Sequence, residues 1–191
     1  MNAIAIVVIV LVALIVLIGL WFMGTHNTLV KLKNQVEEAF STMDVYLKKR
    51  YDLIPNLVET VKAYAKHEGD TLEKVVAARN AAMGASSGNL DDKLAKENAL
   101  SGTLKSLFAV AEAYPDLKSN TNFIDLQEQL KAVEEDIANA RKYYNGSVKN
   151  LNNKVEMFPS SIVAGMFGFT KKPYFEVDST EERQNVKVSF S

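Results

Sequence analysis

The sequence contains no cysteine among its 191 residues and only two histidines. Without cysteine the chain forms no disulfide, no thiolate nucleophile and no cysteine metal site. Di-iron and di-manganese centres in helical bundles use Glu-x-x-His on facing helices, but neither His26 nor His67 has a glutamate three residues before it. The composition therefore predicts neither a metal centre nor a cofactor.

Signatures of catalysis and of nucleic-acid binding are also missing. His67 lies in the polar stretch Lys66–Asp70, which is typical of solvated surface, and no nucleophile elbow or phosphate-binding glycine loop accompanies it. The formal net charge of −1 argues against a nucleic-acid footprint spread over the surface. We therefore interpret the chain as a protein that is not an enzyme and does not bind nucleic acid.

The most distinctive feature that is present is one long apolar run. The 22 basic and 23 acidic side chains begin only at Lys31, and the run from Ala3 to Met23 has no charge and no strong hydrogen-bonding side chain. As a helix it would be about 31 Å long, which matches a hydrocarbon core of about 30 Å. A cleaved signal peptide needs a basic region before the run and a small-residue cleavage site after it. Only Met1 and Asn2 precede this run, so we predict a single transmembrane anchor over residues 1–24.

The orientation of the anchor follows from its flanking charges. Lys31 and Lys33 come after the run, whereas no lysine or arginine comes before it. The positive-inside bias then places the long C-terminal part in the cytoplasm and the short N-terminus outside. The predicted location is the cell membrane, crossed once, with the lipid bilayer as a partner.

Apolar residues recur at helical spacing after the anchor, beginning with the stretch Leu29–Tyr64. Pro55 removes a backbone donor and biases the residue before it away from the α region, so we predict a break or a bend there, with Asp52 as a cap. A second helix should end at the loop Gly84–Asn89, and a third should stop at Pro115.

The last helix has the longest pattern in the chain. It follows residues of good capping type at Asn120–Asn122. Its apolar residues then stand seven apart, as in coiled-coil packing, and predict a helix of about 36 residues. The six members of this series are Phe123, Leu130, Ile137, Tyr144, Leu151 and Phe158.

The order helix, short loop, helix, without strand alternation before Tyr174, predicts an all-α protein. We expect the transmembrane helix to be followed by an antiparallel up-and-down four-helix bundle over residues 25–158. Three long helices result instead if Pro55 only kinks a continuous helix. With four helices the last one returns to the membrane and places Phe158 beside the lipid surface, whereas with three it ends at the far side.

Three blocks of sequence carry a family resemblance: Asp52–Val58 (DLIPNLV), Ala111–Lys118 (AEAYPDLK), and Ala140–Asn145 (ARKYYN) followed by Phe158 and Pro159. With these blocks the chain resembles the LemA family of bacterial membrane-anchored proteins. The resemblance implies a single N-terminal span, a helical-bundle domain in the cytoplasm, and no established activity or catalytic residues. Some relatives are encoded near membrane zinc proteases, which implies an adaptor with another membrane protein, such as a protease, as a partner.

One cation falls on an apolar stripe. Arg50 occupies a position otherwise held by residues such as Met43 and Leu57, so its stem should be buried. A buried charge without a partner costs several kcal/mol, so the guanidinium needs a carboxylate or a carbonyl. Two uses are open: fixing the register of the helices, or holding a small anionic ligand or lipid headgroup together with Arg141. The candidate buried polar residues are Arg50, Arg79, Glu112, Glu134 and Arg141.

The apolar segment Ser160–Phe169 opens the predicted C-terminal region, residues 159–191, and is too short to span a membrane. It could fold under the open end of the bundle. It could instead form a foot on the membrane surface or a contact between copies, with nearby lysines as a small basic ring at the bilayer. The candidate contact residues are Lys31, Lys33, Ile162, Val163, Met166, Phe167, Phe169, Lys171 and Lys172.

The leading hypothesis is a membrane-anchored, non-enzymatic scaffold or adaptor. Confinement to a membrane raises the effective concentration of its copies, so weak lateral contacts suffice and we expect a homo-oligomer. The alternative is a membrane-tethered binding module for a small anionic ligand or a lipid headgroup, recognised by the buried arginines.

Overall fold

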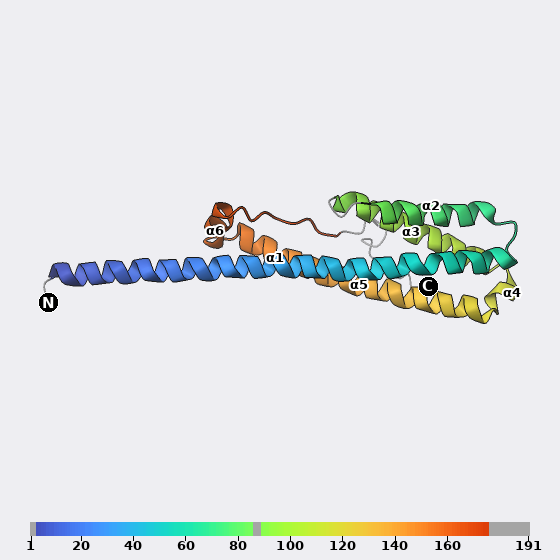
Figure 1. Cartoon of the computed structure of the whole chain (residues 1–191), viewed down its shortest axis with the longest axis horizontal. Coiled ribbons are helices and arrows are strands. Elements are labelled where there is room, and N and C mark those ends of the chain that lie inside the picture. Colours follow the sequence, from blue (N-terminus) through green and yellow to red (C-terminus); the bar gives the residue numbers. More distant parts are fainter. Residues whose placement is uncertain (1–2, 86–88, 176–191) are drawn as a thin grey trace, which may run out of the picture. The chain divides into compact units, whose positions relative to one another are not determined.

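The computed structural model describes residues 3–85 and 89–175, which contain six α-helices and no strand. The predicted all-α class is therefore confirmed. The helices are α1 (Ala3–Tyr64), α2 (Gly69–Gly84), α3 (Leu90–Ala111), α4 (Pro115–Lys118), α5 (Thr121–Glu156) and α6 (Ser160–Met166) (Figure 1). These described residues form two compact units, one of residues 3–42 with 140–174 and the other of residues 43–139 with Phe175.

The first part of α1 is the predicted membrane segment. Every residue from Ala3 to Trp21 is exposed, although the stretch is uncharged and strongly apolar. It is long and apolar enough to cross a membrane. Within its own unit no other segment lies beside this part of the helix (Figure 1).

Of the two outcomes left open at Pro55, a break or a bend within a continuous helix, the break does not occur. α1 continues through Pro55 and ends at Tyr64, and the chain turns over Ala65–Glu68 before α2 begins at Gly69. Because the helix is unbroken, Asp52 caps nothing; its carboxylate instead accepts a hydrogen bond of 3.1 Å from Lys48 Nζ. The first turn after the apolar run is therefore at residues 65–68 and not at Pro55.

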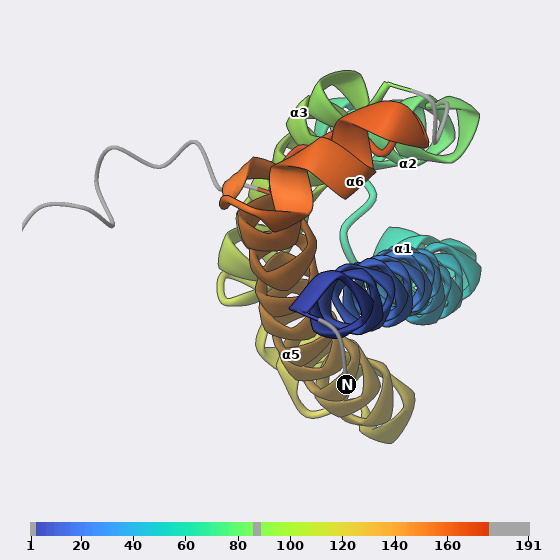
Figure 2. The ribbon, with the colours of Figure 1, turned by 90° about the vertical axis from the view of Figure 1, so that its left-hand side faces the viewer.

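In the first unit α1 and α5 run antiparallel. The ring of Phe40 lies 5.9 Å from that of Tyr144, whereas Phe22, earlier in α1, lies 5.7 Å from Phe167, later in the chain. The short helix α6 turns across the end of α5 (Figure 2). The buried apolar residues of this unit are Leu29, Val36, Ala39, Ala140, Tyr144, Val148, Leu151, Val163 and Ala164.

The second unit contains the rest of α1 and α5 together with α2, α3 and α4. α2 and α3 pack along each other, and the rings of Phe108 in α3 and Phe123 in α5 are 6.3 Å apart. Asn89 and Asn120 cap α3 and α5 with their side-chain oxygens. The larger buried apolar residues of the second unit include Met43, Leu47, Ile54, Leu57, Val61, Leu72, Val75, Leu94, Leu100, Leu104, Leu107, Leu117, Leu130, Val133 and Ile137.

α5 has the predicted length of 36 residues. Five members of the seven-residue series are buried, from Phe123 to Leu151. The sixth, Phe158, lies beyond the end of the helix and is 80% exposed. The periodicity therefore predicts burial only as far as the helix itself extends.

Candidate functional site

A cluster of exposed apolar side chains follows α5. We call residues Met157–Phe169 the apolar foot; the stretch has no charged side chain. Phe158 is 80% exposed and Met166 68% exposed, and Met157, Ile162 and Phe167 are also more than half exposed. Exposed apolar residues are unremarkable singly, but a contiguous group usually marks an interaction surface.

The apolar foot contacts α1 at the end of the apolar run and just beyond it. The Phe167 ring lies 5.7 Å from the Phe22 ring and 4.4 Å from the His26 ring, and the Phe169 ring lies 5.8 Å from His26. Val163 and Ala164 are buried, so one side of α6 is part of the core of its unit. Of the foot residues suggested by the sequence, Val163 packs in the core of the unit and holds the segment in place, whereas Ile162 and Met166 are exposed.

The lysines expected around the foot are only partly available as free charges. Lys171 Nζ donates to Glu156 Oε1 over 2.6 Å, and this hydrogen bond and charge raise the pKa of Lys171. Lys33 Nζ lies 3.7 Å from Glu37 Oε1, so these two charges form an ion pair. The backbone of Lys172 is fixed by two hydrogen bonds of 2.9 Å with the side chain of Asn152.

Lys31 lines a polar hollow in the same unit. The hollow lies along the first turns of α1 after the apolar run and reaches Tyr143 on α5. Its lining carries Glu38 as well as Lys31, so it has no excess charge of one sign. Tyr143 closes one side, with its hydroxyl 3.4 Å from Gln35 Nε2.

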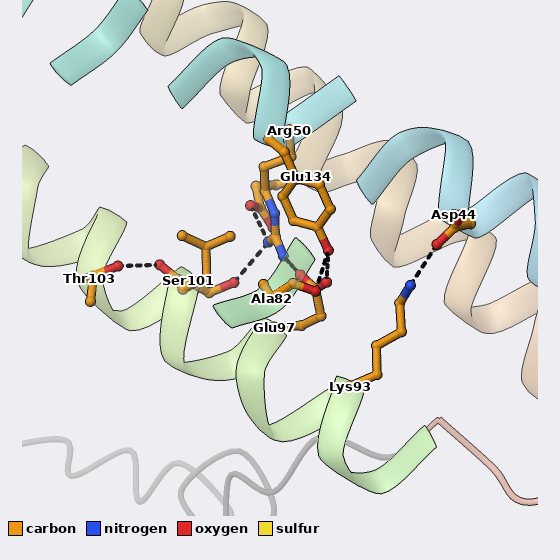
Figure 3. Close-up of polar contacts among 10 residues, drawn as sticks. Asp44, Arg50, Ala82, Lys93, Glu97, Ser101, Thr103 and Glu134 are labelled. Carbon is orange, nitrogen blue, oxygen red and sulfur yellow. Dashed lines mark hydrogen bonds and ion pairs between the residues drawn. The ribbon is translucent and has the colours of Figure 1, made fainter. Parts of the chain in front are cut away.

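A buried polar network occupies the second unit (Figure 3). Arg50 on α1 is only 2% exposed, and its guanidinium contacts α3 and α5. Nη2 donates to the buried carboxylate of Glu97, and Nη1 donates to Glu134 Oε1 at 2.7 Å and to Ser101 Oγ at 3.0 Å. One cation therefore links three helices through two carboxylates and a hydroxyl.

Tyr51 adds a second donor to the same carboxylate. Its hydroxyl donates to Glu97 Oε1. Burial, together with this hydrogen bond, raises the pKa of Tyr51 above its ordinary value, so the hydroxyl keeps its proton and stays a donor. Glu97, only 1% exposed, thus has a donor on each oxygen, as a buried carboxylate requires.

Arg79 explains why α1 continues through Pro55. Proline has no N–H, so Pro55 cannot bond to the carbonyl of Tyr51, four residues earlier. Arg79 on α2 supplies the missing donor, with its Nε 2.7 Å from the Tyr51 oxygen. A contact between helices thus replaces the hydrogen bond that the proline removes.

The remaining candidates lie elsewhere. Glu112 is exposed and pairs with Lys118, so it is not a partner of Arg50. Arg141 is half-buried in the first unit, whereas Arg50 belongs to the second. Glu134 is the one suggested carboxylate that Arg50 contacts.

Sequence reasoning missed Glu97, although a signal was present. The apolar stripe of α3 contains Leu90, Leu94, Leu100, Leu104 and Leu107, and its widest interval is the six residues from Leu94 to Leu100. Glu97 lies on that stripe, three residues after Leu94, in the way that Arg50 interrupts the stripe of α1. Two opposite charges on two apolar stripes predict a buried pair.

A second charged pair joins α1 and α3. Lys93 Nζ lies 2.6 Å from Asp44 Oδ1, and the side chain of Lys93 is almost fully buried while that of Asp44 is half-exposed. The pair lies about two helical turns from Arg50 along α1. Both pairs hold the same two helices at a fixed register.

The chemistry available in the described residues is that of binding and packing. A groove of about 500 Å³ lies between α3 and α5. Its apolar lining is Leu104, Phe108 and Leu130, and its charged lining is Lys105, Lys131, Glu128 and Glu134. Within residues 3–85 and 89–175, no three histidine, aspartate or glutamate side chains converge as metal ligands. The carboxylates around Arg50 neutralise it, so it offers no net charge to an anion.

Comparison with known proteins places these features in a family. The sequence profile of the LemA family matches residues 39–190. This chain belongs to the LemA family. It is 24% identical over 175 residues to Protein LemA of Metamycoplasma hominis, an alignment that covers 88% of this chain and 76% of that protein.

Relatives of a second kind are magnetosome proteins. The chain is 24% identical over 175 residues to Magnetosome proteins MamQ 1 and MamQ 2 of Paramagnetospirillum magneticum, with 79% of this chain and 64% of each relative aligned. It therefore spans slightly less than two thirds of these two proteins. The family name and the names of these relatives are not enzyme names, and they are consistent with a membrane-associated protein.

The three sequence blocks of this LemA family member form contacts between its elements. In the first block, Pro55 leaves the Tyr51 carbonyl without its helical donor, and Arg79 Nε donates to that carbonyl instead. In the second, the Tyr114 hydroxyl donates to Glu68 Oε1 at 3.2 Å, which ties the start of α4 to the turn after α1. In the third, the Tyr144 hydroxyl donates to the Pro173 carbonyl at 3.0 Å, and burial raises the pKa of Tyr144.

Proposed function

We propose that the protein is a membrane-anchored, non-enzymatic scaffold that associates with copies of itself. In this proposal residues 3–23 cross the cell membrane once, the short N-terminus lies outside, and the helical part lies in the cytoplasm. The second unit is then an antiparallel four-helix bundle made of α2, α3 and the adjoining parts of α1 and α5.

The observation that carries the proposal is the continuity of α1. An uncharged stretch of exposed residues that suits a bilayer passes without a break into a helix that buries one face in packed cores. Residues 3–21 are exposed throughout, and lipid is the solvent that suits such a segment.

The polar interior supports a structural role for the helical part. Arg50 donates to Glu97 and Glu134, and Tyr51 donates to Glu97, so the hydrogen bonds of the network are made within the unit. Arg50 and Glu97 are buried, whereas Glu134 borders the groove between α3 and α5. Such a network fixes which helices pair and at what register. The alternative, an anion-binding module, finds no support, because the carboxylates already occupy the Arg50 guanidinium.

Self-association is expected to be visible in the native membrane. Treating membranes that contain the full-length chain with an amine-reactive crosslinker should give products at multiples of 21.2 kDa. Confinement to the membrane plane favours this contact, so the yield should fall when the same protein is dispersed into an excess of detergent micelles. Monomer alone in the native membrane would contradict self-association.

A further inference from the structure

We propose that the apolar foot, Met157–Phe169, is a second membrane contact that inserts into the interfacial layer of the leaflet through which α1 leaves the bilayer. This inference rests on the proposed anchoring by residues 3–23. It assigns a lipid-binding surface to a segment outside the apolar run and distinguishes it from a contact between copies.

The depth of the foot is set by its contacts with α1. Phe167 lies against both Phe22 and His26. The apolar run ends at Met23, so His26 lies about 4.5 Å farther along the helix axis. The headgroup region adds roughly 5–8 Å to each side of the hydrocarbon core. The Phe167 ring is therefore at the level of that region whenever the apolar run fills the core.

The side chains on the free face of the foot suit this level. Ile162 and Met166 are four residues apart, so they share one side of α6, opposite the buried Val163 and Ala164. Phe158, two residues before α6 begins, is also exposed. Together with the exposed Trp21 at the end of the run, these residues resemble the aromatic and apolar belt of a membrane interface.

Charge is placed where a lipid surface requires it. Nothing between Met157 and Thr170 is charged. Of the two lysines that follow, Lys171 is paired with Glu156, which directly precedes the foot, so Lys172 is the lysine that can reach the headgroups. Lysine next to an interfacial apolar segment reaches the headgroups while the apolar side chains lie deeper. The apolar foot contacts the end of the proposed span through Phe167. This contact, and not apolar character alone, is why we propose lipid and not a second copy of the chain as the partner of the foot.

The lack of cysteine makes a depth measurement direct. Single variants Ile162→Cys and Met166→Cys of the full-length chain would carry a nitroxide label in vesicles of phosphatidylcholine and phosphatidylglycerol. Collisions with oxygen, which concentrates in lipid, are compared with collisions with a water-soluble nickel complex. Val45→Cys is the matched control, because Val45 is also apolar and 65% exposed but lies about 33 Å beyond Met23 along α1. Val12→Cys reports on the span itself.

We expect labels at 162 and 166 to collide with the nickel complex several-fold less often than the label at 45, and to approach the values at 12. This protection should be unchanged when the lipid-to-protein ratio is raised. Adding Ile162→Glu to the Met166→Cys variant should raise nickel collisions at 166 without affecting a label at 45.

Two results would overturn the inference. Labels at 162 and 166 that are as open to nickel as the label at 45 would place the foot in water. Protection that disappears on dilution with lipid would make a second copy the occupant. In both cases a protected label at 12 would leave the proposed anchoring intact, whereas an open label at 12 would remove that anchoring as well.

Discussion

Replacing Glu97 with alanine should lower the free energy of unfolding by about 3–5 kcal/mol, the usual cost of removing one partner from a buried ion pair. The variant leaves Arg50, which is 2% exposed, without its buried carboxylate. It also removes the acceptor of the Tyr51 hydroxyl. Glu134 cannot replace Glu97, because it already accepts from the other side of the guanidinium.

Urea unfolding of the full-length protein in detergent, followed by circular dichroism, measures this loss. Glu135→Ala is the matched control, because Glu135 is an exposed glutamate next to Glu134 on the same helix, and should change stability by less than about 0.5 kcal/mol. Replacing both charges, as in Arg50→Met with Glu97→Leu, should recover most of the loss, since no buried charge remains unpaired. A loss below about 1 kcal/mol in Glu97→Ala would contradict the role given to the network.

Arg79→Leu should cost about 1–3 kcal/mol, the price of leaving a buried carbonyl without a donor. The affected carbonyl is that of Tyr51, to which Arg79 Nε now donates over 2.7 Å. In a Pro55→Ala background the new N–H at position 55 can donate to the same carbonyl. The cost of Arg79→Leu should therefore be smaller there, with a coupling of about 1–2 kcal/mol between the two positions.

A double-mutant cycle on these two positions measures the coupling, with stability followed by urea unfolding. Arg79 also contacts Asn80, but that contact is lost in both backgrounds and cancels from the coupling. Arg79→Lys is the control, because lysine keeps a charge and a donor at the site. Equal losses in the two backgrounds would show that Arg79 does not compensate for the proline.

Local patterns accounted for the helices that depend on local chemistry. The apolar run, the seven-residue series of α5 and the capping residue Asn120 are properties of short windows of sequence, and each appears where expected. The spacing of apolar residues predicts which face of a helix is buried, and this prediction does not depend on which element packs against that face.

The proline at position 55 could not be interpreted from its neighbours. The rule that proline breaks a helix assumes that the freed carbonyl finds no other donor. Here the donor to the Tyr51 carbonyl comes from Arg79, 28 residues after Tyr51 in the sequence. The sequence near Pro55 contains no trace of that contact, and only the packing of α2 reveals it.

The residues of the candidate sites could be predicted from the sequence to different degrees. Arg50 stood out because a charge on an apolar stripe is conspicuous, and Glu97 could have been found by the same test applied to α3. The neighbours of the foot were harder to predict, because the contact of Phe167 with Phe22 joins residues that are 145 positions apart. Only the antiparallel course of α5 along α1 brings them together.

Membrane anchoring by the N-terminal run is the claim on which the proposed function depends. The direct measurement is alkaline extraction of membranes from cells that express the full-length chain, followed by mass spectrometry of the N-terminal peptide in each fraction. We predict that the protein stays in the membrane pellet and retains residues 3–23. A soluble product that begins downstream of Thr25 would contradict the account.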